Sequence, residues 1–114
     1  MSDFKSLTRN GEFRRVYAKG KSFGDRALVI YVFKNRQNSL RLGISTGKKL
    51  GNAVVRNRAR RIIKEAFRQL APGLAKNYDY VIVAKSGILN LKSTDVYNIL
   101  QSRLEGTQYM LNGG

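Results

Sequence analysis

The chain lacks the two residue types that most often carry catalysis and bind metals. It contains no cysteine and no histidine among its 114 residues. Without cysteine, disulfide bonds, thiolate nucleophiles and cysteine-based zinc sites are excluded. Without histidine, the usual proton shuttle at neutral pH and the commonest metal ligand are missing. We therefore expect no catalytic residues supplied by the protein itself.

Acidic residues are few and scattered. The chain has seven, and no two of them lie within eight residues of each other: Asp3, Glu12, Asp25, Glu65, Asp79, Asp95 and Glu105. No local carboxylate cluster of the kind used in metal-dependent nuclease chemistry is present, although acids distant in sequence could meet in the fold. The sequence alone does not decide whether the protein holds a metal.

Long apolar segments are also missing. No segment approaches the roughly 20 apolar residues of a membrane-spanning helix, and the N-terminus, MSDFKSLTRNGEF, lacks the apolar run of a signal peptide. A soluble, cytoplasmic protein is the expectation. With 114 residues, 42% of them apolar, the chain fits one domain with a modest core over 1–114. We expect loose tails at 1–9 and 106–114.

Basic residues far outnumber acidic ones in the chain. Lys and Arg number 22, which gives a net charge of +15. These residues are spread along the whole chain, so the body of the protein is itself cationic. Because no hydrophobic anchor accompanies the charge, RNA or DNA is favoured over a membrane surface as the partner.

The most basic segment is 47–68, GKKLGNAVVRNRARRIIKEAFR. Its only acid is Glu65, four residues from Arg61, and its eight basic residues are Lys48, Lys49, Arg56, Arg58, Arg60, Arg61, Lys64 and Arg68. Such a segment can be an ordinary solvated face. Two features argue instead for nucleic acid: arginine, whose fork suits phosphate, predominates, and few acids stand at i±4 to neutralise it.

Hydrophobic spacing predicts the elements. Segment 53–70 has an apolar side at helical spacing and is followed by the helix-breaking pair Pro72-Gly73. Shorter helices are predicted after capping residues Asn10 and Ser93. The expected helices cover 10–18, 53–70 and 94–104; the expected strands cover 27–34, 40–44 and 78–84, with a weak candidate at 21–26. The short polar link at 35–39 predicts a hairpin between the first two strong strands.

Four aromatic residues admit two interpretations. Phe13 and Tyr17 share one side of the first helix, and strand alternation puts Tyr31 and Phe33 on one sheet face. Each could simply belong to the hydrophobic core. Next to a basic helix, they could instead form a cleft in which unpaired RNA bases stack.

Segment 48–61, KKLGNAVVRNRARR, closely resembles the RNR motif of the bacterial ribonuclease P protein family. The resemblance covers nearly the whole chain, because the first helix and the strands at 27–34, 43–45 and 78–84 come in the expected order. It implies an α/β (α+β) two-layer sandwich of order α-β-β-(β)-α-β-α. It also implies a left-handed βαβ crossover through the RNR helix, against the general right-handed rule.

The resemblance further implies a function. The family protein is the small subunit of an endoribonuclease that removes the 5′ leader of precursor tRNA. The RNA subunit carries the catalysis and uses Mg²⁺, while the protein binds that RNA and the leader. No membrane and no obligate protein partner are implied.

Two sets of residues follow from the resemblance. The residues that would bind the RNA subunit are Lys48, Lys49, Asn52, Arg56, Asn57, Arg58, Arg60, Arg61 and Lys64. The residues that would bind the leader are Phe13, Tyr17, Tyr31, Phe33 and Lys49. Three other functions stay open on composition: a ribosomal protein or RNA chaperone, a protein-only nuclease, and a DNA-binding architectural protein.

Overall fold

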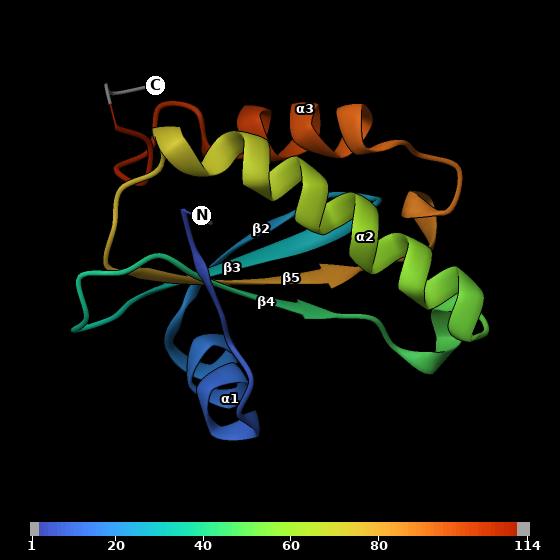
Figure 1. The fold of residues 1–114 in the computed structure, drawn as a ribbon, viewed down its shortest axis with the longest axis horizontal. Coiled ribbons are helices and arrows are strands. Elements are labelled where there is room, and N and C mark those ends of the chain that lie inside the picture. The colour runs from blue at the N-terminus through green and yellow to red at the C-terminus, as the bar shows by residue number, and fades with distance from the viewer. Residues whose placement is uncertain (1–2, 112–114) are drawn as a thin grey trace.

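A computed structural model describes residues 3–111 of the chain (Figure 1). The strands are β1 (Lys5–Ser6), β2 (Lys21–Gly24), β3 (Leu28–Lys34), β4 (Arg41–Ser45) and β5 (Tyr78–Ala84). The α-helices are α1 (Asn10–Lys19), α2 (Ala53–Leu70) and α3 (Ser93–Leu104), and three short 3-10 helices are η1 (Lys48–Leu50), η2 (Ala71–Gly73) and η3 (Ser86–Ile88). Among the described residues, no helix is long and apolar enough to cross a membrane.

The five strands form one sheet in the order β1-β4-β5-β3-β2. β3 is antiparallel to β2 and β5, whereas β4 is parallel to β1 and β5. The chain passes from β4 to β5 through α2, the crossover that the resemblance implies. The left-handed sense of that crossover stays a prediction.

The predicted hairpin of β3 and β4 is wrong, because β5 lies between them. β5 is apolar on both faces: Tyr80 and Ile82 belong to the larger core, and Val81 belongs to a smaller one on the other face. A central position buries both faces of this strand, which an edge position would not do. The 35–39 link therefore spans the end of β5, and the Asn35 N–H donates to the Asn77 carbonyl at 2.9 Å.

Helices cover both faces of the sheet. Figure 1 shows α2 and α3 as one layer over one face and α1 against the other. The mixed α/β class is confirmed, with α1 adding a short layer beyond the expected two. On the α1 side, Leu7, Val16 and Val81 are buried, and Phe13, Tyr31, Phe33 and Val83 pack against them.

The helix α2 has the predicted bounds. Asn52 caps its first turn, because the Asn52 side-chain oxygen accepts the Val55 N–H at 3.0 Å. Pro72 stands in the short 3-10 turn that ends it. The other two helices start at the residues expected to cap them, so the caps lie one residue earlier, at Arg9 and Lys92.

The chain ends are more ordered than expected within the described residues. β1 pairs with β4, and the flanking Phe4 and Leu7 are buried, so the expectation of a loose tail at 1–9 is wrong from residue 4 onward. Tyr109 is 6% exposed and packs edge-on against Tyr78, with ring centres 5.0 Å apart. Apolar side chains in both tails drive this ordering, which spacing arguments overlooked; residues 112–114 lie outside the described part.

Candidate nucleic-acid interface

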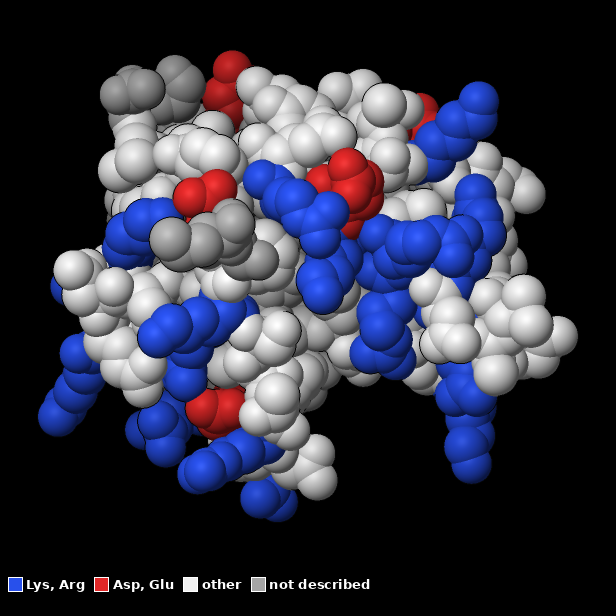
Figure 2. Space-filling view, in the orientation of Figure 1, with Lys and Arg blue, Asp and Glu red and all other residues white. Residues whose placement is uncertain are grey.

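The basic helix α2 presents its charges on the side away from the sheet. Its buried residues are Ala59, Ile62, Ile63, Ala66, Phe67 and Leu70. The exposed residues along the rest of the helix include Asn57, Arg60, Arg61, Lys64 and Arg68. Figure 2 shows Lys and Arg side chains gathered over α2. This basic face is a ready surface for phosphate groups.

Two of its arginines also hold the helix in place. Arg58 donates to the main-chain carbonyls of Leu89 at 3.4 Å and Leu91 at 2.8 Å. On the other flank, Arg60 donates to the Ile44 carbonyl at 3.3 Å and to Thr46 Oγ1 at 2.7 Å. A guanidinium has five N–H donors, so Arg58 and Arg60 each keep further donors for a ligand. Substituting either one would disturb both the fold and the charge.

The single acid of the helix has a different partner from the one that spacing suggests. Glu65 Oε2 accepts from Arg68 at 2.8 Å rather than from Arg61. Both side chains are about half exposed, so this pair adds little stability. Arg61 and Lys64 are exposed and form no ion pair among the described residues. The charge of these two residues is therefore available to a polyanion.

The segment before α2 carries three further predicted residues, Lys48, Lys49 and the capping residue Asn52, whereas the last predicted residue, Arg56, is half-buried on α2 itself. Lys48 and Lys49 are exposed on η1. Gly51 follows with φ of 150°, and a Cβ placed there would come within 2.9 Å of Val55. Only glycine fits this position without strain. The turn thus sets η1 directly against the first turn of α2.

An aromatic cleft lies between α1, the end of β4 and α2. Its volume is about 530 Å³, and its lining residues are Asn10, Phe13, Arg14, Tyr17, Ile44, Ser45, Thr46 and Arg60. Tyr17 is 38% exposed, and its ring stands edge-on to that of Tyr31, with centres 5.0 Å apart. An apolar floor with cationic and hydroxyl groups at the rim suits a base and its phosphate.

A second hollow of about 400 Å³ adjoins this cleft. It shares Phe13, Ile44 and Arg60 with the cleft and extends to Lys64 on α2. Arg60 therefore belongs to both the aromatic cleft and the basic face. The two surfaces form one continuous site.

The predicted leader residues are only partly brought together. Phe13 and Tyr17 line the cleft, and Tyr31 supports Tyr17 from the sheet. Phe33 lines a different pocket, beside Arg15, and Lys49 lies outside the cleft lining. Sequence reasoning missed two cleft residues on α1, Asn10 and Arg14. Asn10 lies three residues before Phe13 and Arg14 three residues before Tyr17, and this i+3 spacing is the signal that would have found them.

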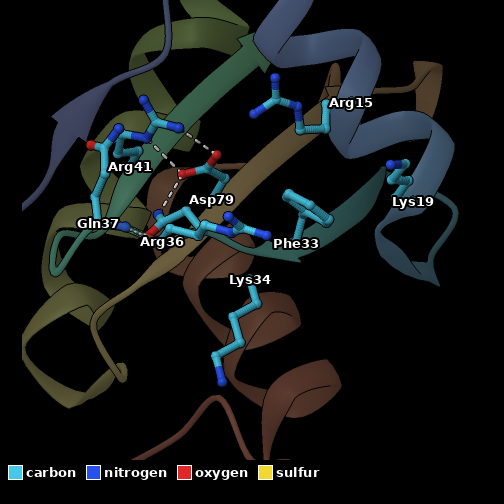
Figure 3. A pocket seen from close by; sticks show the side chains of 9 residues that line it. Arg15, Lys19, Phe33, Lys34, Arg36, Gln37, Arg41 and Asp79 are labelled. Carbon is cyan, nitrogen blue, oxygen red and sulfur yellow. Dashed lines mark hydrogen bonds and ion pairs between the residues drawn. The ribbon is translucent and has the colours of Figure 1, made fainter.

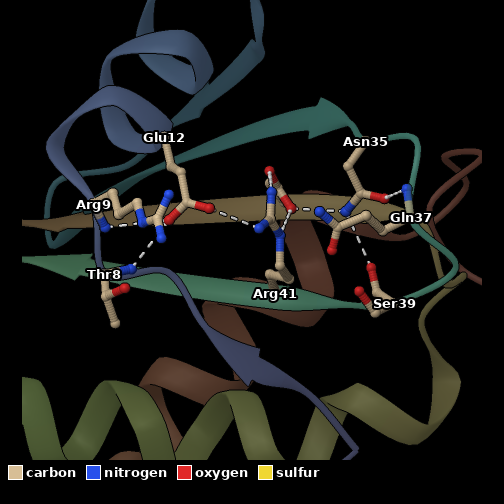
Figure 4. A network of polar contacts seen from close by, with 8 residues as sticks. Thr8, Arg9, Glu12, Asn35, Gln37, Ser39 and Arg41 are labelled. Atoms are coloured by element: carbon tan, nitrogen blue, oxygen red, sulfur yellow. Dashed lines mark hydrogen bonds and ion pairs between the residues drawn. The ribbon is translucent and has the colours of Figure 1, made fainter.

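A buried polar network fixes α1 beside the cleft (Figure 4). The Arg41 Nε and Nη2 atoms donate to the two Asp79 oxygens, each at 2.7 Å, and Nη1 donates to Glu12 Oε2 at 2.8 Å. The Asn35 Nδ2 also donates to Asp79, at 2.7 Å. Asp79 is only 3% exposed. The network ties α1, β4 and β5 together.

Protonation of this network follows from its hydrogen bonds and charges. The hydrogen bonds that Arg41 donates to Asp79 raise the pKa of Arg41 above its usual range. The Arg9 main-chain N–H, with smaller contributions from the Thr8 N–H and from Arg41, lowers the pKa of Glu12. Arg41 and Glu12 are thus held in their charged forms. Among the described residues, no group of three or more acidic, His or Cys residues is placed to hold a metal ion.

Comparison with known proteins shows which family the chain belongs to. Residues 1–107 match the family model described as Ribonuclease P. The chain belongs to the ribonuclease P protein family. It is 42% identical over 100 residues to the ribonuclease P protein component of Clostridium botulinum strain Langeland, covering 87% of this chain and 90% of the relative. The corresponding protein of Clostridioides difficile is 38% identical over 104 residues, covering 90% and 91%.

Solved structures of the family share the fold. The RNase P protein of Staphylococcus aureus superposes with a TM-score of 0.81 at 32% identity, covering 92% of this chain and 96% of that one. The RNase P protein of Thermotoga maritima gives 0.77 at 25% identity, covering 86% and 93%. A member of this family is a subunit of a ribonucleoprotein that acts in tRNA processing, so its partner is the RNase P RNA subunit.

Proposed function

We propose that the chain binds the RNase P RNA through the basic face of α2 and η1, and binds the 5′ leader of precursor tRNA in the aromatic cleft. The RNA subunit then cuts the leader using Mg²⁺, and no protein side chain takes part in the bond cleavage. The observation that carries the proposal is the position of Arg60, which belongs to both surfaces.

Electrostatics give the protein its role. The RNA subunit and the precursor are both polyanions and repel each other. A protein of net charge +15 between them reduces this repulsion and lowers the magnesium concentration that the reaction needs. The phosphate contacts make assembly strongly dependent on salt.

The aromatic cleft explains binding without sequence selection. Every base has a flat face, so stacking on Phe13 or Tyr17 accepts any leader sequence. Arg14 and Arg60 at the rim provide donors for the phosphates on either side of a stacked base. A leader of variable sequence is the single strand that fits such a site.

The decisive assay uses purified protein, a bacterial RNase P RNA and precursor tRNA at low magnesium and near-physiological salt. We expect cleavage at the mature 5′ end with protein and RNA together, and none with protein alone. Cleavage by protein alone would establish a protein-only nuclease. Tight RNA binding without stimulation at any magnesium concentration would favour a ribosomal protein or RNA chaperone, and preference for duplex DNA over structured RNA would favour an architectural DNA-binding protein.

A further inference from the structure

A cationic pocket, shown in Figure 3, lies on the side of α1 away from the aromatic cleft and shares no lining residue with it. Its volume is about 450 Å³, and it lies at the end of the sheet where β3 stops. Arg15 and Lys19 reach it from α1, and Lys34 and Arg36 reach it from the end of β3 and the link that follows. The Phe33 ring lies between these two pairs.

The charges of this pocket are not balanced within the protein. Its only acid is Asp79, whose two oxygens are taken by Arg41 and Asn35. Arg15, Lys19, Lys34 and Arg36 are exposed, and none of them forms an ion pair among the described residues. Four like charges around one hollow repel each other, and a bound anion relieves that repulsion.

The floor of the pocket is rigid. The Arg41 and Asp79 side chains are 13% and 4% exposed, and they are joined by two bonds of 2.7 Å. The Asn35 side-chain oxygen accepts the Gln37 main-chain N–H at 2.9 Å, which fixes the link carrying Arg36. A ligand would therefore meet a preformed site rather than one that must be ordered.

The pocket also continues a path from the aromatic cleft. Arg14 and Tyr17 line the cleft, whereas Arg15, about 200° from Tyr17 around the helix, lines the pocket, so the two hollows lie on opposite sides of α1. An RNA strand leaving the cleft would cross roughly 10–12 Å of helix to reach the pocket. Both arginines are exposed along that crossing. Phe33 then offers a second face on which a base stacks.

We propose that this pocket binds the phosphodiester backbone of the leader upstream of the cleft, after the strand has crossed α1. The inference rests on the proposed binding of the leader in the aromatic cleft. It gives the protein two successive subsites for one strand, and it assigns Phe33 to the second of them. It predicts that affinity rises in two steps as the leader is lengthened.

The test measures affinity of the reconstituted holoenzyme for precursors with a graded series of leader lengths, from none to well beyond the span of α1. The variant Lys19→Gln/Arg36→Gln removes two charges from the pocket. Arg26→Gln/Lys85→Gln removes two exposed charges near the opposite end of β3 and serves as the control of equal net charge. The thermal unfolding temperature should be the same for wild type, the pocket variant and the control variant, because the substituted side chains are exposed.

We expect the pocket variant to lose the second step only. Long leaders should bind about fivefold to tenfold more weakly, and the salt dependence of their affinity should fall by about 0.7 in slope for each phosphate that the variant no longer binds. The pocket variant should bind short-leader precursors and leaderless tRNA as wild type does. The control variant should bind every substrate as wild type does. If the pocket variant bound long-leader precursors as tightly as wild type does, the inference would be overturned. Equal weakening for all substrates would also overturn it, because it would place the RNA subunit or the tRNA body in the pocket.

Failure of the underlying function would look different. If the wild-type holoenzyme bound short-leader precursor and leaderless tRNA equally well, the aromatic cleft itself would have no role in leader binding. That result needs no pocket variant. A wild-type difference at short lengths with no further gain at long lengths would instead refute only the second subsite.

Discussion

The sharpest prediction concerns Tyr17, a residue that is 38% exposed and lines the aromatic cleft. Replacing it with alanine removes the stacking surface and leaves the backbone of α1 unchanged. Stacking of one base on an aromatic ring contributes about 1–3 kcal/mol. At 1.4 kcal/mol per factor of ten, this corresponds to about 5-fold to 150-fold weaker binding of precursor tRNA.

The matched control is Tyr17→Phe, which keeps the ring and removes only the hydroxyl. It should bind precursor tRNA as wild type does. Tyr31→Ala should give a smaller loss than Tyr17→Ala, since Tyr31 contacts the Tyr17 ring from the sheet and does not line the cleft. The order of effects therefore separates a stacking residue from a supporting one.

The assay is equilibrium binding of precursor and of mature tRNA to the reconstituted holoenzyme. The Tyr17→Ala loss should appear with the precursor and vanish with mature tRNA, which has no leader. An equal loss with both substrates would refute leader binding in the cleft. A loss in Tyr17→Phe as large as in Tyr17→Ala would show that the hydroxyl group, rather than the ring, makes the contact.

Three further predictions concern charge. Arg61→Gln should weaken assembly with the RNA subunit and reduce the salt dependence of that affinity by about one unit in slope. Arg68→Gln should change the affinity and its salt dependence less, because Arg68 is already paired with Glu65. Binding titrations of the two variants at several salt concentrations measure this difference. Arg41→Met leaves the buried Asp79 carboxylate without its main partner and should lower the free energy of unfolding by about 3–5 kcal/mol; denaturant melts that show a decrease of under about 1 kcal/mol would contradict this. The lowered pKa of Glu12 stabilises the fold above its unfolded pKa near 4.5, and this contribution disappears as pH falls through the folded pKa. Between pH 6 and pH 3, wild type should therefore lose more free energy of unfolding than Glu12→Gln does. If the two proteins lost the same amount over this range, the prediction would be refuted.

Local features of the fold could be predicted because they depend on neighbours in sequence. The helix Ala53–Leu70 has its apolar residues at helical spacing, a capping asparagine before it and a proline after it. These signals act over a few residues, so the predicted bounds match. Alternation along β3 likewise puts Tyr31 and Phe33 on the α1 side of the sheet, where both pack.

Long-range features could not be predicted in this way. Nothing local indicates that β5 inserts between β3 and β4, because strand order depends on which face each strand must bury. The network of Glu12, Arg41 and Asp79 joins residues 29 and 38 positions apart. The different surroundings of Tyr31, which packs against Tyr17, and of Phe33, which lines a pocket with Arg15 and Lys19, also depend on tertiary packing.

The central place of β5 determines when this protein can fold during its own synthesis. β3 and β4 do not pair with each other, so the β2–β3 and β1–β4 pairs can join into one sheet only when residues 78–84 have left the ribosome. Until then, the nascent chain carries a complete basic helix and at most two separate strand pairs in place of the five-stranded sheet. Pairing over such distances is slow to form. The basic segment is therefore made before the complete sheet that supports it, and that sheet can close only when about three quarters of the chain has been synthesised.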